Sequence, residues 1–312
     1  MPLHIETPLI ESGAMSVPGQ SVWLKMEALQ PPGSFKIRGV GFACEEYVRR
    51  GARRFISSSG GNAGIAAAYA GRRLAVPVVV VVPETTTERA RDLIRREQAE
   101  LIVHGASFQE ANALARSMVG ASDAFIHPFD DPLLWQGHAT MIDEVARAGL
   151  KPDAVLLSVG GGGLLCGVLE GLRRNGWVGV PVVAVETEGA DSLSQALKAN
   201  ARVELARITS IATSLGARQV SEQAFNWSLQ RPVRSSVVSD QAAVAACLRF
   251  MDDQRVVVEP ACGAALAVAY DAVSALPEFR TVLAIVCGGV TASVEQLRKW
   301  SAQSAPPLTA HR

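Results

Sequence analysis

Short apolar segments rich in β-branched residues recur along the chain, and segments of helical period separate them. The apolar segments predict strands at residues 22–26, 54–57, 78–82, 101–103, 154–158, 182–186 and 282–286. The helical period predicts helices at residues 63–74, 88–97, 108–118, 164–174, 241–251 and 264–275. Continuous apolar strands are typical of a parallel sheet that is buried on both faces. The alternation therefore predicts an open α/β architecture, followed by a frayed tail at residues 301–312 that is rich in Ser, Pro and Ala.

Composition and charge narrow the class of protein. Of the 312 residues, 48% are hydrophobic and 19% are charged, which is typical of a compact enzyme with one large or two interleaved domains. Thirty basic and thirty acidic residues cancel, so no basic field favours nucleic acid or an anionic membrane as a partner. The apolar runs are too short to cross a bilayer, and the N-terminus lacks the pattern of a signal peptide. A small zwitterionic or neutral substrate suits this balance.

The cysteine pattern indicates in which cellular compartment the protein resides. Cys44, Cys166, Cys247, Cys262 and Cys287 are scattered and odd in number, and no two of them have CxxC spacing. This pattern argues against a disulfide framework or a zinc site. We therefore expect a protein of the reducing cytoplasm.

Lys36 lies at the centre of the segment Pro-Pro-Gly-Ser-Phe-Lys-Ile-Arg-Gly, between a tight turn and a hydrophobic stretch. A lysine forms a Schiff base with a carbonyl only as the neutral amine, so its pKa must be lowered by desolvation or by a nearby positive charge. Phe35 offers an apolar ring face for this purpose, and Arg38 offers a charge. Taken alone, the segment is also typical of a solvated turn.

A second candidate is the run of four glycines from Gly160 to Gly163, which lies between a predicted buried strand and a predicted helix. Such a loop allows close backbone approach, and its N–H groups together with the helix dipole form a cradle for an anion, best a phosphate. A tight strand–helix turn is the alternative. No Walker sequence is present, and the dinucleotide pattern is not met because Cys166 takes the place of its last glycine.

The third candidate is the loop Ser58-Ser59-Gly60-Gly61-Asn62, which precedes an alanine-rich helix. Its polar residues are also ordinary helix caps. Two glycines among them expose N–H groups at the positive end of the helix, which favours a bound carboxylate. Parallel strands bring such loops to one edge of the sheet. A phosphate cradle, a carboxylate loop and a lysine amine together indicate an amino acid bound to pyridoxal 5′-phosphate (PLP).

Several motifs carry a resemblance to a known family. They are Gly33-Ser34-Phe35-Lys36-Ile37-Arg38-Gly39, Ser58 to Gly64, Pro128 to Pro132, Gly137-His138-Ala139, Gly160 to Leu164, Val258 to Ala265 and Cys287-Gly288-Gly289. In this order they resemble the fold-type-II PLP enzymes, within these the L-serine dehydratase/L-threonine deaminase group of the mammalian liver type. The resemblance runs over nearly the whole chain.

The resemblance implies a role for each matching residue. Lys36 binds the cofactor as a Schiff base and later moves the substrate's α-proton, while Phe35 packs on one face of the cofactor ring. Asn62 hydrogen-bonds the ring hydroxyl, and Cys287 faces the pyridine nitrogen. The cofactor phosphate is held by Gly160, Gly161, Gly162, Gly163 and Leu164. The substrate carboxylate is held by Ser59, Gly60, Gly61 and Asn62. A monovalent cation, K⁺, is bound by Gly160, Glu186, Ala190, Leu215 and Ala217.

The resemblance also implies the fold and the activity. It implies a tryptophan-synthase-β-like fold of two open, mostly parallel twisted sheets with flanking helices. Residues 1–36 and 134–312 form the large PLP-binding domain, and residues 37–133 form a small domain that closes over the substrate. The expected reaction is β-elimination from L-serine to pyruvate and ammonia, and from L-threonine to 2-oxobutanoate. A cytoplasmic homodimer is expected, with no nucleic acid or membrane partner.

Three departures from the family pattern leave alternatives open. Gly60 stands where the liver enzymes carry alanine, Ser214 stands where the family has an apolar residue on the other ring face, and Val290 replaces a serine. These departures bear on rate and substrate preference. The alternatives are another fold-type-II reaction, such as β-replacement or threonine synthesis, and a weakly catalytic amino-acid-binding protein. The loop at 58–63 does not match the Thr-Ser-Gly-Asn-Thr loop of cysteine-synthase-like chains.

Overall fold

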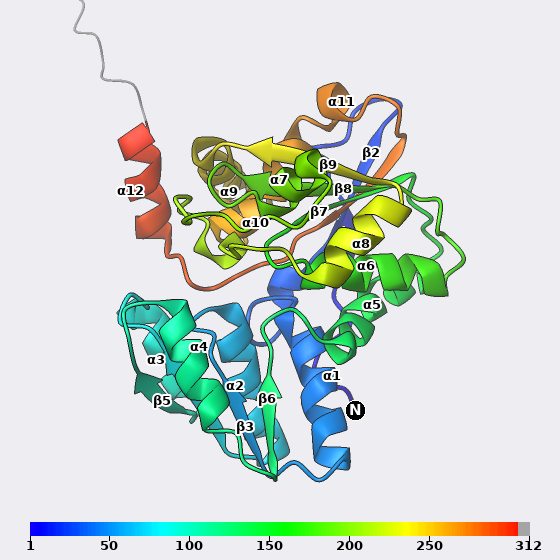
Figure 1. Ribbon diagram of the computed structural model, residues 1–312. Coiled ribbons are helices and arrows are strands. Elements are labelled where there is room, and N and C mark those ends of the chain that lie inside the picture. The colour runs from blue at the N-terminus through cyan, green and yellow to red at the C-terminus, as the bar shows by residue number, and fades with distance from the viewer. Residues whose placement is uncertain (305–312) are drawn as a thin grey trace, which may run out of the picture.

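Two sheets with flanking helices make up the protein (Figure 1). The structure is a computed structural model that describes residues 1–304. The larger sheet has the strand order β1-β2-β10-β7-β8-β9, and the smaller has the order β5-β4-β3-β6. β1 pairs antiparallel with β2, and the other neighbours are parallel. The predicted fold class, with two mostly parallel sheets, is confirmed.

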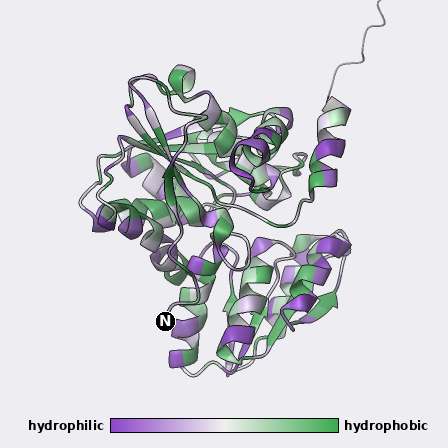
Figure 2. Ribbon diagram, turned by 180° about the vertical axis from the view of Figure 1, so that it is seen from behind, coloured by the Kyte–Doolittle hydropathy of each residue, from purple (hydrophilic) through white to green (hydrophobic). Residues whose placement is uncertain are grey.

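The predicted strands agree with the structure to within a residue, and β1, β6 and β9 are additional to them. The larger sheet contains β1 (Leu9–Glu11), β2 (Ser21–Lys25), β7 (Ala154–Ser158), β8 (Val182–Thr187), β9 (Val233–Val238) and β10 (Thr281–Ile285). The smaller contains β3 (Arg54–Ser57), β4 (Val78–Val82), β5 (Glu100–Val103) and β6 (Asp123–Ile126). Every residue of β4, β7 and β8 is buried, as expected of parallel strands covered on both faces. Figure 2 shows hydrophobic residues along the inner strands of the larger sheet.

The helices cover both faces of the sheets. They are α1 (Lys36–Arg49), α2 (Asn62–Leu74), α3 (Glu88–Arg96), α4 (Phe108–Ser117), α5 (Pro132–Arg147), α6 (Gly163–Arg174), α7 (Ser192–Ala199), α8 (Glu222–Gln230), α9 (Asp240–Gln254), α10 (Pro260–Tyr270), α11 (Ala272–Ala275) and α12 (Val294–Ser304), with 3-10 turns η1 (Glu27–Leu29) and η2 (Thr213–Leu215). Among the described residues, no helix is both long and apolar enough to span a membrane.

The helix expected over 241–251 continues to Gln254 in α9, and two predicted segments differ more than this from the structure. The helix expected over 264–275 is two helices, because α10 ends at Tyr270 and Asp271, a residue that favours caps over helix interiors, lies between it and α11. The expected fraying from residue 301 is wrong for 301–304, which complete α12. The remainder of that predicted tail, residues 305–312, lies outside the described residues.

Helices α1 and α5 meet through glycines. A Cβ atom built on Gly137 would lie 2.2 Å from the carbonyl oxygen of Arg38, and one on Gly39 would lie 2.5 Å from Cε1 of His138. The backbones can approach this closely only without side chains at these positions. This contact holds the start of α1, and therefore Lys36, against α5.

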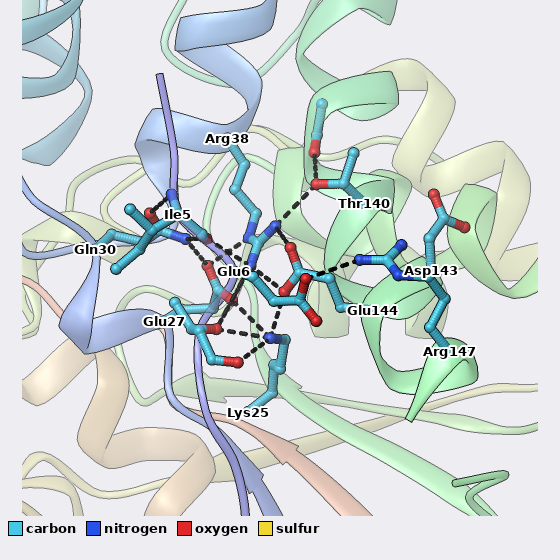
Figure 3. A network of polar contacts seen from close by, with 12 residues as sticks. Ile5, Glu6, Lys25, Glu27, Gln30, Arg38, Thr140, Asp143, Glu144 and Arg147 are labelled. Carbon is cyan, nitrogen blue, oxygen red and sulfur yellow. Dashed lines mark hydrogen bonds and ion pairs between the residues drawn. The ribbon is translucent and has the colours of Figure 1, made fainter. Parts of the chain in front are cut away.

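A buried ion cluster lies beside the α1–α5 contact (Figure 3). The Arg38 guanidinium donates to both carboxylate oxygens of Glu27 and of Glu144, and Lys25 also donates to Glu144. Lys25, Glu27 and Arg38 are at most 1% exposed, and Glu144 is 5% exposed. Two cations and two anions balance, so these costly buried charges are fully paired. The cluster joins β2 and η1 to the helices α1 and α5.

Candidate active site

The turn that carries Lys36 pairs with the loop that follows β10. Ser34 and Gly288 form an antiparallel bridge, the Phe35 amide donates to the Cys287 carbonyl at 3.1 Å, and the Gly289 amide donates to that of Gly33 at 2.8 Å. Gly288 and Gly289 have φ angles of 85° and 113°, which favour glycine. This pairing places Lys36 beside Cys287 although the two are far apart in sequence.

The amine of Lys36 is enclosed. Its Nζ donates to the carbonyl oxygen of Pro128 at 2.6 Å and lies 5.1 Å from the centre of the Phe35 ring. Burial lowers the pKa of Lys36 to about 8, while Cys287 and Glu259 oppose that shift. The expectation that the charge of Arg38 activates the amine is wrong, because Glu27 and Glu144 neutralise that charge inside the ion cluster. Desolvation supplies the neutral amine instead.

Each glycine of the 160–163 loop lies where a side chain would collide with a neighbour. A Cβ atom would lie 2.9 Å from the Leu215 Cα at Gly160, 2.3 Å from the Phe129 ring at Gly161, 2.3 Å from Cβ of Ala224 at Gly162 and 2.7 Å from the Phe129 carbonyl oxygen at Gly163. Phe129 follows Pro128, which accepts the hydrogen bond of Lys36. The loop therefore lies against the segment that contacts the amine.

The same loop presents free amides at a helix end. α6 begins at Gly163, and Gly162, with a φ of 95°, precedes it without a side-chain cap. Among the described residues, the amides of 160–164 donate no hydrogen bond. Unpaired N–H groups and the helix dipole suit an anion such as a phosphate. The loop thus fits the phosphate group that the sequence predicts.

Asn62 faces the larger sheet. α2 begins at Asn62, directly after Gly61, and no side chain caps this helix. Asn62 therefore does not act as a helix cap. Its Nδ2 donates to Glu259 at 2.7 Å and to the Ser214 hydroxyl at 3.3 Å, and its Oδ1 accepts from the Val290 amide at 3.1 Å. The Gly61 amide donates to the Ser59 hydroxyl at 3.3 Å. Asn62 therefore meets two of the residues that depart from the family pattern.

Glu259 is a site residue that the sequence analysis missed. Its side chain is 3% exposed and accepts hydrogen bonds from Asn62 and from Thr291, and its carboxyl carbon would lie 2.1 Å from a Cβ atom at Gly289. Burial raises the pKa of this carboxyl group. One signal was present in the sequence, because Glu259 is the lone charged residue in the apolar stretch 256–269.

Cys287 keeps its proton. A hydrogen bond with the Cys262 thiol, together with burial, raises the pKa of the Cys287 thiol well above its ordinary value. A neutral thiol beside Lys36 is a weak hydrogen-bonding group without charge. It suits a neutral pyridine nitrogen, which a carboxylate at this position would instead keep protonated.

His138 lies behind Phe35, and its motif in the sequence indicates no role for it. The two rings are 4.8 Å apart, and neither imidazole nitrogen has a hydrogen-bond partner among the described residues. Burial lowers the pKa of His138 well below its ordinary value, so the ring is neutral. The neutral ring supports Phe35 by packing.

The contacts of the residues predicted to bind a cation link them in two sets. Gly160 contacts Leu215, the Ala217 amide donates to the Leu215 carbonyl at 2.7 Å, and Ala190 pairs with Thr187, next to Glu186. The Glu186 carboxylate is fully buried and accepts from the amides of Leu193 and Ser194 at 2.8 and 2.7 Å. Burial raises its pKa to about 8. Among residues 1–304, no group of three or more His, Cys, Asp or Glu side chains forms a metal site.

Fold and site together define a class. Two mostly parallel sheets with a desolvated lysine amine, a glycine cradle for a phosphate and a neutral thiol fit an enzyme that carries PLP. The family described as pyridoxal-phosphate dependent enzyme matches residues 1–288, and the chain belongs to this family.

Named relatives span nearly the whole chain. A human L-serine dehydratase/L-threonine deaminase is 46% identical over 95% of this chain and 94% of its own length. A mouse serine dehydratase-like protein is 46% identical over 97% of this chain and 95% of its own. The crystal structure of a fungal L-serine ammonia-lyase from Rhizomucor miehei matches with a TM-score of 0.92 at 34% identity, covering 98% of this chain and 100% of that one.

Proposed function

We propose that this protein is a PLP-dependent ammonia-lyase that converts L-serine to pyruvate and ammonia, and L-threonine to 2-oxobutanoate. The observation that carries the proposal is the Lys36 amine, desolvated and held beside the neutral Cys287 thiol by the pairing of their two loops. The activities named for relatives at 46% identity over almost the full chain support the choice of reaction.

The chain's own residues divide the work of holding the cofactor. When bound, PLP withdraws electrons from the substrate's α-carbon and so makes its proton acidic. The free amides of Gly160 to Leu164 bind its phosphate, and Phe35 covers one face of its ring. The Nδ2 of Asn62, which donates to Glu259 and Ser214 in this structure, would turn to the ring hydroxyl. Cys287 meets the pyridine nitrogen without adding charge.

Lys36 moves the proton in this proposal. Its amine would attach the cofactor covalently, and as a free amine it would take the substrate's α-proton as a general base. With a pKa of about 8, roughly a tenth of the amine is neutral at pH 7, far more than for an ordinary lysine. The positive end of α2, at residues 59–62, receives the substrate carboxylate and so orients the α-carbon toward that amine.

A binding site for a monovalent cation near the phosphate loop is also part of the proposed function. The sequence resemblance assigns it to Gly160, Glu186, Ala190, Leu215 and Ala217. Ser158 on β7 pairs with Val185 on β8, so Gly160 and Glu186 follow at adjacent strand ends. A K⁺ ion would offset the burial that raises the pKa of Glu186 and would keep this carboxylate ionised.

Domain closure, assembly and location are further parts of the proposal. Residues 37–133 close over the substrate against residues 1–36 and 134–312, a division supported by the smaller sheet, whose strands lie between residues 54 and 126. The homodimer rests on the resemblance, and light scattering tests it. Five free, buried cysteines suit a reducing cytoplasm.

Pyruvate release from L-serine, followed by absorbance, tests the reaction. We expect turnover in the wild type and none in Lys36→Ala, although that variant still binds PLP non-covalently. Exposed Lys151→Ala is the control and keeps full activity. No pyruvate or 2-oxobutanoate from the wild type, or a sulfide-dependent product in their place, would reject elimination.

A further inference from the structure

The space beside Gly60 is filled by the side chain of Thr86. A Cβ atom built on Gly60 would lie 2.6 Å from Oγ1 of Thr86, 2.8 Å from its Cγ2 and 3.3 Å from its Cβ. Both residues are part-exposed. The contact therefore lies in an accessible part of the molecule and not in its core.

No rotamer of Thr86 would make room for a side chain at residue 60. Threonine carries two heavy atoms on its Cβ, and in the structure both face Gly60. A rotation of 120° about χ1 turns one of them away and leaves the other in place. The size of residue 60 and the size of residue 86 are thus tied to each other.

Thr86 is held at this position by its own loop. It lies between β4 and α3, where its amide donates to the Pro83 carbonyl at 3.0 Å, and the next residue, Thr87, caps α3 through the Ala90 amide. These contacts fix the backbone on both sides of Thr86, so its side chain cannot withdraw freely from Gly60.

The start of α3 also reaches the loop after β10. Arg89 donates to the Val290 carbonyl at 2.9 Å, and the Val290 amide donates to Asn62 at 3.1 Å. Residues 86–89 therefore contact the predicted carboxylate loop at Gly60 and are joined to Asn62 through Val290. Among the described residues the part-exposed Thr86 hydroxyl has no hydrogen-bond partner, so it is free to meet a ligand.

We propose that Thr86 is a specificity-determining residue that forms the wall of the substrate pocket beside Gly60. Its methyl group limits the room for a substituent on the substrate's β-carbon, and its hydroxyl faces the bound amino acid. This inference rests on the proposed function, because that function places the substrate carboxylate at residues 59–62. The side chain of Thr86 then sets the choice between serine and threonine.

Two ligands without a β-hydroxyl test the wall directly, since they bind but cannot lose water. L-Alanine is deoxyserine and L-2-aminobutyrate is deoxythreonine, so they differ by the methyl group in question. The absorbance change of the cofactor on titration gives each Kd. We expect Thr86→Ser to strengthen binding of L-2-aminobutyrate relative to L-alanine by roughly tenfold, the effect of one methyl group in a close-fitting pocket. The ratio of kcat/KM for threonine over serine should rise in parallel.

Two control variants test whether the effect comes from the shape of the side chain and from residue 86 itself. They are Thr86→Val and Thr85→Ala. Valine keeps the shape of threonine and removes its hydroxyl, so the ratio of the two dissociation constants should stay as in the wild type. Thr85 is exposed and adjacent, and its replacement should change nothing. Thermal unfolding and cofactor absorbance establish that each variant is folded and loaded. A Kd ratio that Thr86→Ser leaves within twofold of the wild type would overturn the proposal.

The contact between Gly60 and Thr86 can also be tested by substituting both residues. Gly60→Ala should weaken binding of both ligands, because its methyl collides with Thr86, and the double variant Gly60→Ala/Thr86→Ala should recover that loss. Strictly additive effects would contradict the coupling.

If wild-type protein binds both ligands with the expected dependence on Thr86 but releases no pyruvate from serine, the pocket wall stands and the proposed reaction fails. If serine and threonine are turned over and their ratio does not depend on Thr86, the reaction stands and the pocket wall fails.

Discussion

Arg38 meets Glu144 through two parallel hydrogen bonds, Nη1 to Oε1 at 2.6 Å and Nη2 to Oε2 at 2.7 Å. This bidentate pair joins the first turn of α1, which begins at Lys36, to α5. Planar two-point recognition fixes direction as well as distance, which a lysine cannot do. The pair therefore sets where α1 starts relative to the larger sheet, and with it the position of the Lys36 amine.

Removing the guanidinium should be costly. Arg38→Met leaves Glu27 and Glu144 buried against Lys25 alone, and breaking a buried pair costs about 3–5 kcal/mol. Arg38→Lys should lose less, because it keeps the charge. Denaturant unfolding of the loaded protein measures both. The exposed pair Arg147–Glu6, also drawn in Figure 3, is the control, and Arg147→Met should have almost no effect. Equal losses for Arg38→Met and Arg147→Met would contradict this account.

A methyl group on Gly161 should weaken cofactor binding. Its Cβ would lie 2.3 Å from the Phe129 ring, and overpacking of this kind costs about 1–3 kcal/mol, which corresponds to roughly 5- to 150-fold in the Kd of PLP if it falls on the bound state. Equilibrium dialysis of Gly161→Ala measures the loss. Gly179→Ala is the matched control, because no atom lies within 4 Å of a Cβ there. Phe129→Ala added to Gly161→Ala should recover binding, and failure to do so would assign the loss to the backbone.

The sheets could be predicted from sequence because their strands are continuous apolar runs, but other elements gave weaker signals. α1 carries Gly39 and Gly41, which lower helix propensity, and the close approach to α5 that requires Gly39 exists only in the folded chain. β9 is an edge strand, and its exposed Arg234 and Ser235 interrupt the apolar pattern. Tertiary contacts decide both elements.

Some residues of the candidate site could be predicted from local sequence, and others could not. Glycines and Lys36 are visible in sequence because their chemistry is tied to local motifs. Glu259 became part of the site only when α10 brought it against Asn62. The partner of Gly60 was equally hidden, since nothing local to Thr86 indicates which loop it faces. Long-range pairs of this kind depend on how the two sheets pack and have no periodic signal.

Attachment of the cofactor should follow the titration of Lys36. Its pKa is lowered to about 8, so the neutral amine, which in the proposed function would attack the cofactor, predominates above that pH and becomes about tenfold scarcer for each pH unit below it. Reconstitution of the cofactor-free protein, followed by absorbance, should quicken up to about pH 8 and then level off. Lys36→Ala binds PLP without covalent attachment and should lack this dependence. The same profile in that variant would assign the titration to another group.

Glu186 should make stability depend on pH and on K⁺ together. Without a cation, burial raises the pKa of its carboxyl group from 4.5 to about 8, so the folded state holds a proton that the unfolded state loses at lower pH. The free energy of unfolding therefore falls as the pH rises from about 4.5 to 8. A bound K⁺ replaces that proton, so its stabilising effect should be larger at pH 8.5 than at pH 6. Thermal unfolding in KCl, against tetramethylammonium chloride at equal ionic strength, measures the difference, and Glu186→Gln should abolish it. An equal K⁺ effect at both pH values, or one that survives in Glu186→Gln, would place the cation elsewhere.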